Sequence, residues 1–265
     1  MILLGVALFF LLQLTAQEYV SESLHSFSIN ASTLNTNKTI WVYLPKNYTK
    51  SKAKYPVIYM HDAQNLFDAK ASYAGEWKVD DYMDGLGIGE SIVVGIEHGN
   101  DKRIDELTPF KHDKYGGGQG EAYLDFIINI VKPKIEADYR VKTNPSDTTI
   151  MGSSLGGLLS FYAILKYPEE FGNAGVFSPS FWINPEIFDL VENTDIPSSS
   201  KFYIMVGGKE GESMVEDFEK MVELLKSKGL SASNLTSEII QDGEHNEKLW
   251  ASQFPKAYQW FNSSN

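Results

Sequence analysis

The sequence predicts one α/β domain over residues 17–265, with a mostly parallel sheet of about eight strands, an N-terminal antiparallel hairpin and helices on both faces. Short apolar runs rich in β-branched residues alternate with segments of helical periodicity, which is the pattern of a parallel sheet with crossover helices. The first two strand-like segments are separated only by a polar turn, as in a hairpin. A length of 265 residues with 43% hydrophobic residues is enough for one large core.

The expected strands begin with two half-polar segments and continue mostly as apolar runs typical of strands buried on both faces. They comprise residues 26–30, 39–44, 55–60, 91–96, 148–151, 174–177, 201–206 and 237–240. Apolar residues at helical spacing predict helices over residues 77–83, 121–139, 158–165, 214–225 and 250–261. Pro133 is expected to kink the second of these helices, and the glycines at 116–118 to form a flexible lead-in to it.

The composition excludes several classes of function. The formal net charge is −12, and an acidic surface repels phosphate backbones, so we expect no nucleic-acid partner. The chain contains no cysteine, which removes disulfides, thiolate metal sites and cysteine nucleophiles. We expect neither a metal ion nor an organic cofactor.

Residues 1–16 have the pattern of a signal peptide. Their apolar run is too short to span a membrane and is followed by Ala16, a small residue at which a signal peptidase could cut. A basic segment ahead of the run is missing, and an uncleaved anchor is the alternative. We expect a secreted or periplasmic protein whose mature chain does not insert stably in a membrane.

A Gly-x-Ser-x-Gly pentapeptide marks the point around which the functional site is expected to form. It runs from Gly152 to Gly156, follows the fifth strand and precedes a helix, which is the sequence form of a nucleophile elbow. Such a turn is so sharp that bulky side chains at either glycine would clash. Ser154, at its centre, is therefore the candidate nucleophile.

A serine hydroxyl needs a base to take its proton, and the base needs an acid to orient it. His245 is the only histidine after Ser154, and it stands in the loop after the last strand, where this fold places its base. The acid is expected after the preceding strand. Glu210 lies there between glycines that let a short loop turn its carboxylate toward the histidine, and Glu212 and Asp217 are the alternatives.

Two backbone N–H groups are needed to stabilise the negative charge that develops on the substrate oxygen. One is expected from Leu155, directly after the nucleophile. The other is expected from the loop after the third strand, where the residues alone leave Ala63 and Gln64 as alternatives.

Several further residues are candidates for the substrate pocket. His61 and Asp62 lack a third ligand at suitable spacing, so a loop-stabilising role is expected rather than a metal site. Trp182, in the loop after the sixth strand, is a candidate for lining an aromatic or sugar pocket, with a packed loop aromatic as the alternative. Arg103 is expected to form a local ion pair with Asp105 and Glu106 that frames the pocket, with a substrate-binding arginine as the alternative.

Four short motifs stand at or near the ends of expected elements. They are Tyr59-Met60-His61-Asp62-Ala63-Gln64-Asn65-Leu66-Phe67-Asp68, Gly152-Ser153-Ser154-Leu155-Gly156-Gly157, Tyr167-Pro168-Glu169-Glu170-Phe171 and Gly243-Glu244-His245-Asn246. With them the chain resembles the putative-esterase (esterase D-like) family of α/β-hydrolases, which includes siderophore esterases and the feruloyl and acetyl-xylan esterases of carbohydrate esterase family 1. The resemblance implies an α/β-hydrolase fold and a triad of Ser154, Glu210 and His245. It favours the N–H of Gln64 as second oxyanion donor, although Ala63 replaces the usual glycine of that turn.

We therefore expect a serine carboxylic-ester hydrolase that acts through an acyl-enzyme. Its substrate is expected to be a small-molecule or oligosaccharide ester, with acyl or feruloyl esters of carbohydrate first. A siderophore trilactone is the alternative substrate, although its binding would require basic pocket residues. An acyltransferase and a non-catalytic binding module on the same scaffold are the alternative functions.

Overall fold

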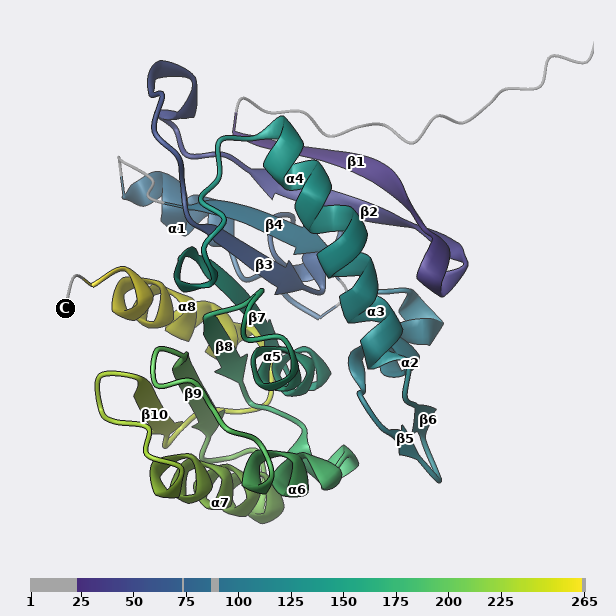
Figure 1. Cartoon of the computed structure of the whole chain (residues 1–265), viewed down its shortest axis with the longest axis vertical. Helices are drawn as coiled ribbons and strands as arrows, with labels where there is room; N and C mark the ends of the chain where they lie inside the picture. The colour runs from purple at the N-terminus through teal and green to yellow at the C-terminus, as the bar shows by residue number, and fades with distance from the viewer. Residues whose placement is uncertain (1–22, 73, 87–90, 264–265) are drawn as a thin grey trace, which may run out of the picture.

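The structure is a computed structural model that describes residues 23–263 apart from 73 and 87–90. Its centre is an eight-stranded sheet with the strand order β1-β2-β4-β3-β7-β8-β9-β10 (Figure 1). These strands are β1 (Leu24–Ala31), β2 (Thr36–Tyr43), β3 (Val57–His61), β4 (Ile92–Ile96), β7 (Thr148–Ser153), β8 (Asn173–Phe177), β9 (Lys201–Gly207) and β10 (Leu235–Ile240). The expected signal peptide lies outside the described residues. Within the described ranges, no helix has the length and hydropathy needed to cross a membrane.

The predicted fold class is confirmed by the pairing of these strands. β1 and β2 form an antiparallel hairpin, and β2 joins the sheet antiparallel to β4. All other neighbours, from β4 through β3 to β10, are parallel. The carboxyl ends of β3, β4, β7, β8, β9 and β10 therefore meet at one edge of the sheet, where ligands bind in open α/β folds.

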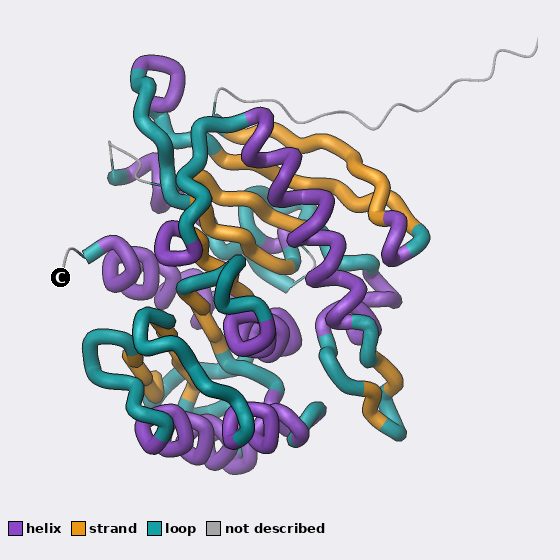
Figure 2. The backbone as a smooth tube through the Cα atoms, viewed as in Figure 1, coloured by secondary structure: helices purple, strands orange, loops and turns teal. Residues whose placement is uncertain are grey.

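Helices cover both faces of the sheet (Figure 2). They are α1 (Val79–Gly85), α2 (Arg103–Leu107), α3 (Gly120–Phe126), α4 (Lys132–Asp138), α5 (Leu155–Lys166), α6 (Glu186–Glu192), α7 (Glu212–Ser227) and α8 (Glu247–Asn262). Alternate residues of one strand supply two separate cores. Tyr59 of β3 packs in the core shared with α2 to α7, whereas Met60 packs in the core shared with α1 and α8. This alternation explains why β3, β4, β7 and β8 are buried at every position.

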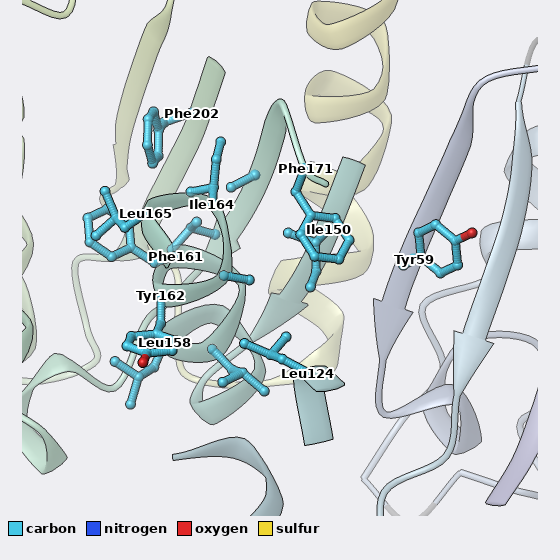
Figure 3. Packing of buried hydrophobic residues seen from close by; sticks show 14 of the residues in the cluster. Tyr59, Leu124, Ile150, Leu158, Phe161, Tyr162, Ile164, Leu165, Phe171 and Phe202 are labelled. Atoms are coloured by element: carbon cyan, nitrogen blue, oxygen red, sulfur yellow. The ribbon is translucent and has the colours of Figure 1, made fainter. Parts of the chain in front are cut away.

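The larger core is centred on α5, the helix that leaves the elbow. Leu158 and Phe161 of α5 lie in one buried cluster with Ile150 of β7 and Phe202 of β9, and all four are fully buried (Figure 3). At roughly 2 kcal/mol for each large side chain removed from water, this cluster holds the elbow rigidly against the sheet.

Two local expectations are refined by the structure. The segment around Pro133 is α3, a π-helical turn over Ile127–Val131, and then α4. Proline lacks the N–H of a regular helical bond, and a wider turn directly before it accommodates that loss. The glycines at 116–118 do not form a flexible lead-in. Two of them form β6 (Gly116–Gly117), which pairs with β5 (Lys111–His112) in a small hairpin.

A buried ion pair connects the N-terminal hairpin to α2. Lys38 Nζ lies 2.6 Å from each carboxylate oxygen of Glu106, and the two side chains are 3% and 4% exposed. The same carboxylate accepts a hydrogen bond of 2.8 Å from the N–H of Gly99. The pair thereby ties β2, α2 and the loop after β4 together beneath the site.

Replacing Lys38 by methionine is expected to lower the free energy of unfolding by about 3 kcal/mol, because Glu106 would remain buried without its cation. Urea denaturation at neutral pH measures this loss. The Lys38→Met, Glu106→Gln double variant should recover part of it, since it leaves no unpaired buried charge. A loss below about 1 kcal/mol in the single variant, typical of a surface pair, would contradict this role.

Candidate active site

Ser154 occupies a strained turn between β7 and α5. Its φ and ψ angles are 57° and −118°, a region that residues with a side chain rarely adopt. The surrounding loops hold this conformation. The N–H of Ser154 donates to the carbonyl of Phe177 at 2.9 Å, and the N–H of Ser180 donates to the carbonyl of Ser154 at 3.1 Å. The geometry is that of a nucleophile elbow, with the serine at its tip.

The glycines on either side of Ser154 are required by close backbone packing. A Cβ on Gly152 would lie 2.9 Å from the carbonyl carbon of Gly156, which is too close for any side chain. A Cβ on Gly156 would lie 3.2 Å from Cβ of His61. The need for small residues that the sequence predicts is thus explained by contact with the helix backbone and with β3.

Glu210 and His245 are in direct contact. Nδ1 of His245 lies 2.8 Å from Oε2 of Glu210. The carboxylate is completely buried, whereas the histidine side chain is 37% exposed. Of the three carboxylates that the sequence left open, the structure brings Glu210 to the histidine; Glu212 is an exposed residue at the start of α7, and Asp217 lies further along that helix. A hydrogen on Nδ1 that faces the carboxylate leaves Nε2 free to accept a proton.

Three residues that the sequence did not assign to the site, Ser178, Gly207 and Trp250, hold Glu210 in place. Its Oε1 accepts hydrogen bonds from the hydroxyl of Ser178 at 2.5 Å and from the N–H of Gly207 at 2.8 Å. The indole N–H of Trp250 donates to the same hydroxyl at 2.8 Å. Trp250 also packs edge to face on His245, with ring centroids 5.0 Å apart. Glu210 and His245 are therefore fixed by the end of β9, the loop after β8 and α8.

Ser154 and His245 line one cavity of about 440 Å³ at the carboxyl edge of the sheet. Its lining residues are Asp62, Gln64, Asn65, Ala71, Ala74, His98, Asn100, Arg103, Ser153, Ser154, His245, Glu247 and Trp250. In the described chain, the Ser154 hydroxyl is hydrogen-bonded to that of Ser180 at 3.1 Å, and no hydrogen bond joins it to His245. Catalytic hydrogen bonds of unliganded enzymes often form only when substrate binds.

The two N–H groups expected to form an oxyanion hole belong to Leu155 and Gln64. Leu155 is the first residue of α5, where a helix has no internal acceptor for its N–H. Gln64 lies in a short 3₁₀ turn after Asp62, whose φ of 57° is left-handed. Among the backbone hydrogen bonds of the described loops, neither N–H has a backbone acceptor. Both donors are thus available on segments that border the cavity.

Side-chain contacts fix the turn that carries Gln64. Arg103 binds the carboxylate of Asp62 through Nε and Nη2, each at 2.8 Å. The amide of Gln64 donates to the carbonyl of His98 at 3.0 Å and accepts from its N–H at 3.2 Å. Burial alone would raise the pKa of Asp62, but the charge and hydrogen bonds of Arg103 outweigh burial and hold that pKa below its ordinary value. The expected pairing of Arg103 with its neighbours in sequence is therefore wrong, because its guanidinium reaches back to β3.

His61 and Trp182 do not line the cavity. His61 is buried beneath the elbow, and its Nδ1 lies 3.3 Å from the hydroxyl of Tyr123. Trp182 is 44% exposed and packs edge to face on Tyr115, with centroids 5.7 Å apart. Asp62, the third pocket candidate, does line the cavity. In the loop after β8, the hydroxyls of Ser178 and Ser180 face the site, whereas the indole of Trp182 faces outward. The sequence of the loop alone does not reveal this difference.

His61 gives the protein a specific sensitivity to acid. Burial lowers its pKa to about 4 from an ordinary value of 6.5. The unfolded chain therefore takes up a proton on this residue as the pH falls below 6.5, whereas the folded protein does so only near pH 4, and stability is lost across that window.

Between about pH 7 and pH 4.5, the protein is expected to lose about 2 kcal/mol more unfolding free energy than the His61→Gln variant. Urea denaturation of both proteins at the two pH values measures the difference. A change of packing in the variant alters its unfolding free energy equally at both pH values, so it cancels from the difference. Parallel losses in the two proteins would show that the buried imidazole does not determine the acid sensitivity.

The described residues contain no group of three or more histidine or acidic side chains arranged to hold a metal ion. The residues near the serine instead comprise a hydroxyl on a strained turn, an imidazole with a buried carboxylate partner, and two N–H groups without a backbone acceptor. A serine on the elbow between β7 and α5, together with this strand order, defines an α/β-hydrolase fold. A family model described as putative esterase matches residues 31–261, and the chain belongs to that family.

Comparison with known proteins agrees with this class. The chain is 29% identical over 242 residues to the uncharacterized protein YbbA of Bacillus subtilis, covering 86% of this chain and 94% of the relative. It is 29% identical over 209 residues to an endo-1,4-beta-xylanase/feruloyl esterase of Xylanibacter ruminicola, covering 76% of this chain and 26% of that protein. The solved siderophore hydrolase EstA from Aspergillus nidulans shares the fold, with a TM-score of 0.72, 19% identity and coverage of 98% and 100% of the two chains.

Proposed function

We propose that the protein is a serine esterase in which Ser154 is the nucleophile, His245 the base and Glu210 the acid. One observation carries the proposal: Nδ1 of His245 lies 2.8 Å from the buried carboxylate of Glu210, and the same histidine lines one cavity with the serine on the elbow. A binding module would not need this buried carboxylate–histidine pair beside a strained serine.

The proposed reaction follows from these contacts. Nε2 of His245 accepts the proton of the Ser154 hydroxyl as its oxygen attacks the ester carbonyl. The N–H groups of Leu155 and Gln64 stabilise the oxyanion of the tetrahedral intermediate. Glu210 stabilises the imidazolium, which then gives its proton to the leaving alcohol. Water attacks the acyl-enzyme by the same route and releases the acid.

Acyl or feruloyl esters of carbohydrate are the proposed substrates. The similarity to a xylanase/feruloyl esterase supports this class. Trp182, the aromatic pocket candidate, lies outside the cavity and packs on Tyr115, so the proposal does not rest on it.

Hydrolysis assays of the purified protein test this proposal, with methyl ferulate, acetylated xylan and an iron-loaded catecholate trilactone as substrates. Hydrolysis of either of the first two, with labelling of Ser154 by a fluorophosphonate probe, is the expected result. Labelling of no serine together with no hydrolysis would favour a binding module. Transfer of the acyl group to an added alcohol, in excess of hydrolysis, would favour an acyltransferase.

We also propose that the protein is secreted or periplasmic, on the basis of residues 1–16. N-terminal sequencing of the protein purified from its host tests this proposal. A mature N-terminus soon after Ala16 is expected, whereas an intact Met1 would contradict cleavage.

A further inference from the structure

The positive charge in the cavity is already neutralised by the protein. Arg103 is the one lysine or arginine among the described residues that line the cavity. Both of its hydrogen bonds of 2.8 Å go to Asp62, one to each carboxylate oxygen. This bidentate arrangement is the strongest that an arginine forms with a carboxylate, so little of its charge is available to a ligand.

A second carboxylate in the cavity has no such partner. Glu247 is the first residue of α8, is 8% exposed and lines the cavity. Its Oε1 accepts a hydrogen bond of 3.3 Å from the amide of Asn65, and within the described residues it forms no ion pair with a lysine or arginine. Burial, with a smaller contribution from the charge of Asp62, raises the pKa of Glu247, although the charges of Arg103 and His245 act in the opposite direction.

The remaining titratable residues of the lining do not supply a compensating charge. Burial lowers the pKa of His98, so that it is neutral at neutral pH. His245 must be neutral to act as a base in the proposed function. The cavity therefore holds two carboxylates and one guanidinium, in a protein whose net charge is −12. Behind His245, the buried carboxylate of Glu210 adds a further negative charge.

We propose that this cavity selects ester substrates by charge, favouring cationic and uncharged groups over anionic ones, and that Glu247 sets the selection. The inference rests on the proposed esterase function and narrows its substrate class. Charges a few ångströms apart at a partly buried site change binding by at least about tenfold, and walls of low polarity concentrate the field. Feruloyl and acetyl esters are uncharged and fit the proposed selection. An iron-loaded catecholate trilactone is anionic and does not fit it.

Three aryl acetates of similar size test the proposal: phenyl acetate carrying a para carboxylate, a para carboxamide or a para trimethylammoniomethyl group. Pairs of esters are mixed and hydrolysed by the full protein at mildly alkaline pH, where carboxylates are ionised. The ratio of their kcat/KM values in such a competition does not depend on how much of the enzyme is folded. Differences in intrinsic reactivity between the esters cancel when variants are compared.

The Glu247→Gln variant is expected to raise the ratio for carboxylate over carboxamide by about tenfold and to lower the ratio for trimethylammonium over carboxamide. Glu212→Gln, which removes the same charge from the exposed start of α7, should leave both ratios unchanged. Two results would overturn the inference while leaving the esterase function intact. One is a change of less than about twofold in these ratios in Glu247→Gln. The other is a preference of the unmodified protein for the carboxylate ester after correction for intrinsic reactivity. Absence of hydrolysis of all three esters, with no fluorophosphonate labelling, would instead refute the proposed function.

Discussion

Replacing Ser154 by alanine is expected to lower the kcat for p-nitrophenyl acetate by roughly 10³-fold or more. On the proposed mechanism the variant lacks the atom that forms the acyl-enzyme, so only binding and the oxyanion donors would remain to accelerate attack by water. The substitution removes a small, partly exposed group and introduces no new contact, so the unfolding midpoint should be preserved. Steady-state kinetics and urea denaturation of the same preparation measure both quantities.

A matched control is Ser213→Ala at the start of α7, where the serine is exposed and does not line the cavity. It should retain full activity and full fluorophosphonate labelling. Activity of Ser154→Ala within about tenfold of the unmodified protein would show that this serine is not the nucleophile, since loss of a true nucleophile costs far more than that.

Glu210→Gln is expected to lower kcat by about 10²- to 10⁴-fold. The amide keeps the shape of the side chain, and its oxygen can still accept from Ser178 and Gly207. The NH₂ group would then face Nδ1 of His245, where the carboxylate oxygen now lies 2.8 Å away. A donor at that position forces the ring hydrogen onto Nε2, and the histidine can no longer accept the proton of the serine.

Glu212→Gln and Asp217→Asn are the controls, because the sequence alone left both residues as alternatives for the acid. Neither residue contacts His245 in the structure, and both variants should keep the kcat of the unmodified protein. A larger effect of either control than of Glu210→Gln would reassign the acid.

Much of the fold could be predicted from the sequence because its signals are local. The apolar runs that became β3, β4, β7 and β8 are buried on both faces, so they lack the alternation of a half-exposed strand. The elbow is encoded in consecutive residues, since Gly152 and Gly156 are needed within one turn of Ser154. The position of His245 after the last strand followed from chain order alone.

The contacts that complete the site could not be predicted in the same way. Asp62 and Arg103 are 41 positions apart, Ser178 and Glu210 are 32 apart, and Trp250 and Ser178 are 72 apart. Each pair joins segments that follow different strands, and no periodicity in the sequence shows which of these segments meet. The apolar spacing over residues 250–261 places Trp250 on the buried face of α8, where it lies, but the partner of its N–H is supplied only by the tertiary structure.

The support that Trp250 gives to Glu210 has a consequence for how the protein would lose its activity. Helix α8 follows all ten described strands along the chain, and its indole N–H anchors the Ser178 hydroxyl that binds the carboxylate of Glu210. A local opening that detaches α8 while the sheet stays folded would release this anchor. On the proposed mechanism, hydrolysis would therefore stop before the protein unfolds as a whole.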